Sequence, residues 1–203
     1  MIALDRPAAL LPIDMQQAFD TPPWPRRWNM NLDRNGRTLL GLWRKAGWPI
    51  VHVQHDSIEP NSTLLPDRPG HDFRDGFTPQ GAEPLVRKSV NAAFIGTDLE
   101  LQLRRLGIET VVAFGISTDI CVSTTTRVGA NLGFRMIVVG DACDCFDLPD
   151  PSGGTISAET IHAAHLATLG FEFAKVVTTE ELGKALIATR PSERPASRSR
   201  TAR

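Results

Sequence analysis

The sequence predicts an α/β domain of three layers, in which a mostly parallel six-stranded sheet is covered by helices on both faces. Short apolar segments alternate with longer amphipathic segments along most of the chain, as strands and crossover helices do in a parallel sheet. Glycine follows three of the amphipathic segments, at Gly107, Gly133 and Gly170, where a left-handed residue commonly ends a helix. A length of 203 residues suits one such domain with a sizeable core.

The elements of this Rossmann-like α-β-α arrangement follow from the hydrophobic periodicity. The predicted strands are short apolar runs: Ala8–Asp14, Ile50–His55, Leu85–Lys88, Thr110–Gly115, Arg135–Asp141 and Lys175–Val177. The predicted helices are the amphipathic segments between and after them: Leu32–Ala46, Thr97–Leu106, Ile120–Leu132, Ser157–Leu169 and Glu180–Ala188. Pro12 conflicts with a central first strand because it has no N–H to donate, so we expect a bulge or an early end there.

The domain is expected over residues 1–187, with a basic tail over residues 188–203. The tail carries five arginines against one glutamate and few large apolar residues, so we expect it to be disordered. The whole chain has a formal net charge of −1, which gives no global field that would attract nucleic acid. No nucleic-acid partner is therefore expected.

The sequence shows no recognisable targeting signal, and this, together with its cysteine usage, predicts a cytoplasmic protein without a membrane partner. No apolar stretch approaches the roughly 20 residues that span a bilayer. The N-terminus lacks the basic and apolar segments of a secretory signal. The three cysteines cannot all pair, and Cys143 and Cys145 are too close in sequence for an easy disulfide, which favours a reducing compartment.

Three chemically distinctive residues follow the ends of predicted strands. Asp14 ends the first strand, Lys88 ends the third, and Cys121 lies at the strand-to-helix turn after the fourth. Because the carboxyl ends of parallel strands lie at one edge of the sheet, these side chains are expected to share a site. A helix start and a nearby ammonium both favour a thiolate, so we expect a lowered pKa at Cys121.

These segments resemble the isochorismatase-like cysteine hydrolase family, which includes the nicotinamidase-related amidohydrolases. The resemblance rests on Ile13–Phe19, Lys88–Phe94 and Gly115–Val122, in that order, and extends from about Ala8 to Leu186. It implies a small-molecule substrate and a homo-oligomer, either a dimer or a tetramer.

The resemblance also assigns roles to individual residues. It implies a catalytic triad of Asp14, Lys88 and Cys121, in which the thiolate attacks a carbonyl carbon and Asp14 carries the proton. It implies an oxyanion hole at Ser117 and Cys121, next to a cis peptide bond between Ile116 and Ser117.

Two long connections, over residues 20–30 and 56–83, follow strand ends and can overhang the site. Trp24 and Trp28 in the first connection are candidates to wall a substrate pocket, or to pack within the loop or against another subunit. Further candidates for contact with substrate are Phe19, Asn91 and Phe94, of which the last two could equally close the turn that contains them.

A metal ion and other cofactors are not expected. Nicotinamidases in the broader family carry an Asp-x-His pair after the second strand, and here Asp56 is followed by Ile58 in place of that histidine. His52 and His55 should face opposite sides of a strand, and with His71 they form no convincing set of three ligands. The remaining cysteines and histidines are interpreted as packing and helix-face residues: Cys143, Cys145, His162 and His165.

The sequence therefore predicts a metal-independent cysteine hydrolase that cleaves a small amide or related C–N bond through a thioester on Cys121. One alternative is an isochorismatase-type vinyl ether hydrolase that uses Asp14; those enzymes generally lack the cysteine, so Cys121 disfavours it. Another alternative is a non-catalytic binding protein on the same fold. A nucleotide-binding protein is improbable because no glycine-rich loop follows the first strand.

Overall fold

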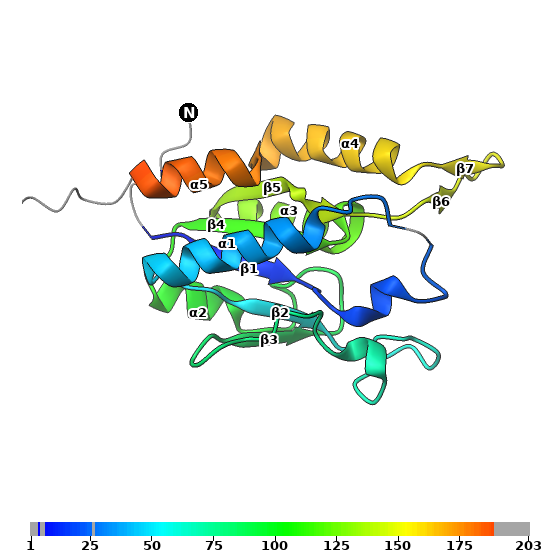
Figure 1. Cartoon of the computed structure of the whole chain (residues 1–203), viewed down its shortest axis with the longest axis horizontal. Helices are drawn as coiled ribbons and strands as arrows, with labels where there is room; N and C mark the ends of the chain where they lie inside the picture. The colour runs from blue at the N-terminus through cyan, green and yellow to red at the C-terminus, as the bar shows by residue number, and fades with distance from the viewer. Residues whose placement is uncertain (1–3, 5–6, 26, 189–203) are drawn as a thin grey trace, which may run out of the picture.

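The computed structural model describes residues 4, 7–25 and 27–188, and these form a three-layer α/β domain (Figure 1). Its central sheet has six strands in the order β3-β2-β1-β4-β5-β8, and every neighbouring pair is parallel. The strands are β1 (Ala9–Ile13), β2 (His52–His55), β3 (Leu85–Lys88), β4 (Thr110–Ile116), β5 (Arg135–Asp144) and β8 (Ala174–Val177). The predicted fold class and all six predicted strands are confirmed.

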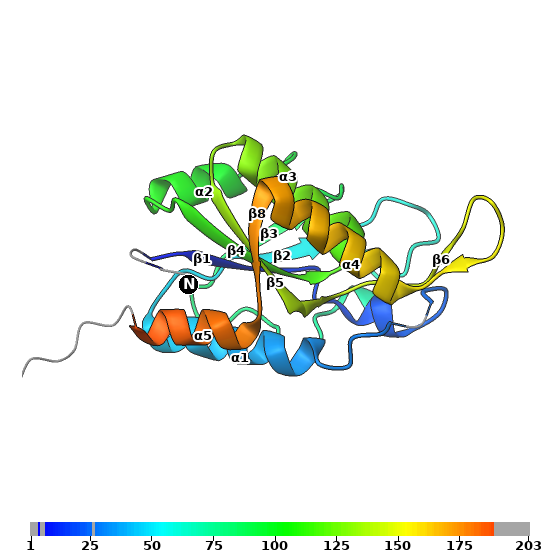
Figure 2. The same ribbon diagram turned by 90° about the horizontal axis from the view of Figure 1, so that it is seen from above.

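Helices cover both faces of the sheet (Figure 2). One face carries α1 (Leu32–Ala46) and α5 (Thr179–Ala188), and the other carries α2 (Leu99–Arg105), α3 (Ser123–Asn131) and α4 (Ala158–Thr168). The apolar stripe of α1 is buried against the sheet because its large side chains recur at helical spacing. A Cβ at Gly36 would lie 2.8 Å from the rings of both Phe77 and Phe114, so α1 approaches the sheet closely only because this position is glycine.

The core is centred on β1 and β4, in which every residue is buried. Two-sided burial explains why these segments are almost continuously apolar. Two of the three predicted glycine caps are confirmed, since Gly107 and Gly133 have φ values of 65° and 87°. The third is wrong, because Gly170 lies within a further helical turn, η4 (Leu169–Phe173), that extends α4.

Pro12 does not distort β1. The strand keeps one register against β4 from Ala9 to Ile13, so the expected bulge or early end is wrong. Toward β2, the N–H groups of Leu10 and Asp14 each donate to carbonyls at 2.9 Å, and Pro12 lies between them. The missing donor therefore interrupts only the short ladder to β2, and the sheet tolerates it there.

The connection between β5 and α4 differs most from expectation. Strand β5 runs three residues beyond its predicted end, and a two-stranded hairpin, β6 (Leu148–Pro149) and β7 (Thr155–Ile156), projects from the body after it (Figure 1). The described residues contain no helix that is long and apolar enough to cross a membrane. Residues 189–203, most of the predicted basic tail, lie outside the described residues.

Candidate active site

Asp14, Lys88 and Cys121 meet at the carboxyl edge of the sheet. Lys88 Nζ lies 2.6 Å from Asp14 Oδ2 and 3.5 Å from Cys121 Sγ. All three residues are buried, at 0%, 2% and 8% exposure respectively. The long Lys88 side chain explains how β3 reaches β1 although β2 lies between them. An ammonium therefore lies between a carboxylate and a thiol in a site largely shielded from solvent.

Asp14 has an unusual backbone conformation and an unsatisfied side chain. Its φ of 51° lies in the left-handed region, which is uncommon for residues other than glycine. Its Oδ1 atom is buried and has no hydrogen-bond partner among the described residues, whereas Oδ2 accepts from Lys88. A strained residue that also carries an unpaired buried oxygen is typical of a functional position.

The pKa of the Cys121 thiol is raised, not lowered as the sequence predicts. Burial is the largest cause, the charge of Asp14 adds to it, and the charge of Lys88 offsets it only in part. The helix start and the ammonium both favour the thiolate, but the loss of solvation on burial outweighs them. Burial therefore favours the neutral thiol in the resting site, with a carboxylate oxygen of Asp14 within 4.8 Å of the sulfur.

The turn that carries Cys121 depends on Gly115, the penultimate residue of β4. A Cβ at Gly115 would lie 2.0 Å from the Ile13 carbonyl oxygen, and its φ is +135°, so only glycine fits there. The Ile116–Ser117 peptide bond is cis, as the resemblance implied. The chain then enters η3 (Thr118–Val122), and both Ser117 and Cys121 reach the same cavity.

That cavity has a volume of about 180 Å³ and opens next to the triad. Its wall combines aromatic and aliphatic side chains with several polar groups that converge on the triad, as in sites for small molecules. It is lined by Asp14, Phe19, Trp24, His55, Ser62, Leu64, Asn91, Ser117, Ile120 and Cys121.

A sequence model described as the isochorismatase domain matches residues 8–181. This chain belongs to the isochorismatase family, whose members include hydrolases. It is 39% identical to the isochorismatase family protein YrdC of Bacillus subtilis over 186 residues, which cover 92% of this chain and all of that protein. It is 28% identical to nicotinamidase 3 of Arabidopsis thaliana, with 89% of each chain covered. A crystal structure of an isochorismatase-family protein from Chromobacterium violaceum superposes with a TM-score of 0.87 at 41% identity, covering 92% of this chain and 96% of that one.

Most of the predicted contact residues line the cavity of this family member. Phe19 and Trp24 pack edge to face with ring centroids 4.8 Å apart, and Asn91 Oδ1 lies 3.9 Å from Cys121 Sγ. Phe94 does not line the cavity, because it stacks on Phe134 at 5.6 Å between centroids and fills the space next to Gly129 of α3. It belongs to the core and so, contrary to expectation, does not reach the described cavity.

His55 is the main residue of the site that sequence reasoning missed. It is the last residue of β2, it pairs directly with Lys88 across the strands, and its Nδ1 lies 3.1 Å from Lys88 Nζ. Its position at a strand end, like those of Asp14 and Lys88, was a signal that could have found it. Ser62 and Leu64, from the long connection after β2, were also missed.

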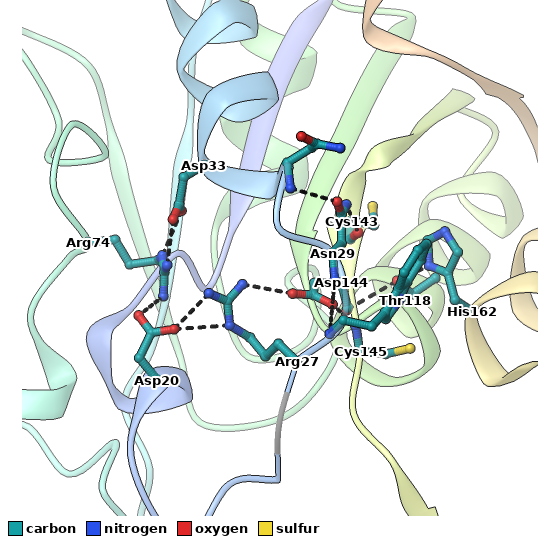
Figure 3. A network of polar contacts seen from close by, with 12 residues as sticks. Asp20, Arg27, Asn29, Asp33, Arg74, Thr118, Cys143, Asp144, Cys145 and His162 are labelled. Carbon is teal, nitrogen blue, oxygen red and sulfur yellow. Dashed lines mark hydrogen bonds and ion pairs between the residues drawn. The ribbon is translucent and has the colours of Figure 1, made fainter. Parts of the chain in front are cut away.

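The connection over residues 20–30 is fastened by a network of charges (Figure 3). Asp144, fully buried at the end of β5, accepts from Arg27 Nη1 at 2.7 Å and from the N–H of Asn29 at 3.1 Å. Arg27 also pairs with Asp20, and Arg74 pairs with Asp20 and Asp33. These bonds hold the segment that presents Trp24 to the cavity.

The same network changes the interpretation of two residues. Thr118, next to Ser117, donates to the Asp144 carbonyl at 3.1 Å and lies 2.8 Å from His162 Nδ1. His162 is therefore buried against η3 and is more than part of a helix face. Trp28 packs on His162 with centroids 5.1 Å apart and does not wall the cavity.

The residues of the site do not suit a metal ion. Asp14, His55 and Cys121 each bring one possible ligand atom within 4.8 Å of the others, but the Lys88 ammonium lies among them and would repel a cation. The position after β2, where nicotinamidases carry an Asp-x-His pair, does not suit a metal ion either. The side chain at the histidine position is Ile58, which is 76% exposed, and the Asp56 carboxylate already binds His71 at 2.7 Å and Arg87 at 3.1 Å. Cys143 and Cys145 are fully buried in the packing of β5 and the segment after it.

Proposed function

We propose that this protein is a metal-independent cysteine hydrolase that cleaves a small amide or related C–N bond through a thioester on Cys121. The observation that carries the proposal is the position of Lys88 between Asp14 and Cys121, together with the unpaired Oδ1 of Asp14 at the same cavity. A thiol is a weak nucleophile until a base removes its proton, and Asp14 is the carboxylate within reach.

In the first half of the reaction, Asp14 takes the thiol proton and the sulfur attacks the carbonyl carbon. Lys88 stabilises the thiolate that forms, because its ammonium already lies 3.5 Å from the sulfur. The backbone N–H groups of Ser117 and Cys121 would hold the oxyanion. When the C–N bond breaks, the leaving nitrogen takes the proton from Asp14, and a thioester remains on Cys121.

In the second half, a water molecule attacks the thioester and gives a proton to Asp14. The C–S bond then breaks, the acid product leaves, and the proton returns to the sulfur. The sum of the two halves is amide plus water giving carboxylic acid plus amine or ammonia. Asp14 is unchanged at the end, as a general acid–base group must be.

The cavity favours a small substrate without net charge. Its volume of about 180 Å³ limits the size of the ligand, and the charges of Asp14 and Lys88 offset each other. No arginine is among its described lining residues to bind an anionic group. The nicotinamidase relative, by its name, hydrolyses nicotinamide, which is a small uncharged carboxamide.

The test is ammonia release from a panel of small uncharged carboxamides that includes nicotinamide. The proposal predicts turnover of at least one member, lost in Cys121→Ala and in Asp14→Asn. Vinyl ether hydrolysis of isochorismatase type needs only the acid, so a Cys121→Ala variant that turns over its substrate at the normal rate would replace the thioester mechanism with that alternative.

A further inference from the structure

His55 is built into the site more firmly than a residue that merely borders a cavity. Its backbone N–H donates to Gln16 Oε1 at 2.9 Å, and its carbonyl accepts from Gln16 Nε2 at 3.1 Å. Gln16 itself is fully buried and also donates to the His71 carbonyl at 2.9 Å. The end of β2 is therefore clamped by a side chain that follows Asp14 by two residues.

The hydrogen bond between His55 and Lys88 fixes the protonation of the imidazole. An ammonium can only donate, so Nδ1, at 3.1 Å from Lys88 Nζ, must accept and cannot carry a proton. The ring is then neutral with its proton on Nε2. Burial and the Lys88 charge also hold the pKa of His55 below its usual value, which agrees with a neutral ring.

The opposite edge of the ring is free to act on a ligand. His55 is half-buried and lines the cavity, and among the described residues Nε2 has no hydrogen-bond partner. A neutral imidazole with its proton on Nε2 therefore offers one N–H donor to the cavity, on the side away from Lys88.

We propose that His55 has two roles in this site, each performed by one edge of its ring. Its Nδ1 edge positions the Lys88 ammonium between Asp14 and Cys121, and its Nε2–H binds the polar group of a small carboxamide in the cavity. The second role rests on the proposed function. The first role does not, because it concerns contacts within the resting protein.

Lys88 needs this third acceptor for a geometric reason. An ammonium has three N–H donors, and among the described residues the three atoms within hydrogen-bond distance of Nζ are Asp14 Oδ2, Cys121 Sγ and His55 Nδ1. Loss of the His55 acceptor would leave a buried donor unpaired and allow Nζ to move away from the sulfur. The reactivity of Cys121 should then fall even though no residue of the triad has changed.

Iodoacetamide tests both roles without any turnover. It is a small uncharged carboxamide that alkylates thiolates, so its saturation constant KI reports binding in the cavity and its limiting rate kinact reports the reactivity of Cys121. Cys121 should be alkylated first, since it lines the cavity and has Asp14 and Lys88 beside it, whereas Cys143 and Cys145 are fully buried. Peptide mass spectrometry identifies the modified thiol.

Two amide variants separate the roles, because each can place a polar atom near only one of the two ring nitrogens. In His55→Asn the amide oxygen can occupy the place of Nδ1, which keeps the acceptor for Lys88 but removes the donor to the cavity. In His55→Gln the amide nitrogen can reach the place of Nε2, which keeps the donor but removes the acceptor. His52→Asn is the matched control, because His52 lies on the same strand and pairs with Glu83 at 2.9 Å on the other side.

The expected result is a crossed pattern. His55→Asn should keep kinact within about threefold of the wild type and raise KI by about tenfold, while His55→Gln should lower kinact by about tenfold and keep KI. His52→Asn should change neither constant at a temperature well below its Tm. Equal effects of the two His55 variants on both constants, or no effect of either on proteins shown to be folded, would overturn the proposal. Either result is independent of whether any carboxamide in the panel is hydrolysed.

Discussion

Two charge clusters lie on opposite sides of β2, and they differ in how completely their carboxylates are paired. Around His52, both oxygens of Glu83 are bonded, to Arg44 at 2.7 and 2.9 Å, to His52 at 2.9 Å and to the N–H of Gln80 at 2.8 Å. Around His55, Asp14 Oδ2 is bonded to Lys88 but Oδ1 has no partner among the described residues. A carboxylate whose two oxygens are both hydrogen-bonded stabilises the fold, whereas a buried carboxylate with one unpaired oxygen retains a place for a proton.

The largest effect should come from substitutions in the cluster around Asp14, whose Oδ1 is unpaired. Asp14→Asn and Lys88→Ala should each lower the rate of carboxamide hydrolysis by about 10³-fold or more, since the groups of a triad act as a unit. Steady-state kinetics on the best carboxamide of the panel measures this. Thermal unfolding provides the control, because removing one partner of the buried Asp14–Lys88 pair leaves the other charge uncompensated and lowers stability, so turnover is compared per folded molecule well below each Tm. Near-normal turnover in either folded variant would contradict the role given to this cluster.

A substitution in the fully hydrogen-bonded cluster around Glu83 should affect stability alone. Glu83→Gln should lower the free energy of unfolding by about 1–2 kcal/mol at neutral pH, because it removes charge-assisted hydrogen bonds from Arg44 and His52. The rate of hydrolysis per folded molecule should not change. Denaturant titration of the variant and the wild type measures the difference.

The pH dependence of that difference has a definite sign. Although burial opposes it, bonding to Arg44, Gln80 and His52 lowers the pKa of Glu83 from 4.5 to about 2. A carboxylate with a depressed pKa contributes stability above its unfolded pKa and loses it as the pH falls. The destabilisation by Glu83→Gln should therefore shrink between about pH 4.5 and pH 2, and a constant difference over this window would contradict the explanation.

The smallest expected effect concerns metal ions. Dialysis against a strong chelator should leave turnover unchanged. The Lys88 ammonium lies among the possible ligands Asp14, His55 and Cys121, and Arg87 forms an ion pair with Asp56. Elemental analysis of the purified protein before and after dialysis accompanies the assay. A stoichiometric metal whose return restores lost activity would overturn this prediction.

Much of the fold and the triad could be predicted from sequence because local patterns determine them. The buried strands β1 and β4 are nearly continuous apolar runs, and strand ends place Asp14 and Lys88 at one edge of the sheet. The prediction of a cis bond at Ile116–Ser117 came from the family resemblance, because residue types alone do not indicate such a bond.

The errors involve contacts between segments that are distant in the sequence. The contact of His55 with Lys88 requires the neighbouring position of β2 and β3, and the burial of Phe94 requires Phe134, forty residues away. The raised pKa of Cys121 depends on desolvation, which the sequence does not display. Gly170 has the residue type of a helix cap, but it lies within η4, where a Cβ would meet Val176 of β8 at 3.4 Å.

Trapping of the acyl enzyme tests the central claim most directly. Hydroxylamine competes with water for a thioester, so turnover of a carboxamide in its presence should yield the hydroxamate in proportion to hydroxylamine concentration. A rapid acid quench should show the acyl group on the peptide that contains Cys121, and Cys121→Ala should give neither hydroxamate nor adduct. Ammonia release by Cys121→Ala at the wild-type rate, with no adduct on the wild-type protein, would contradict a thioester on Cys121.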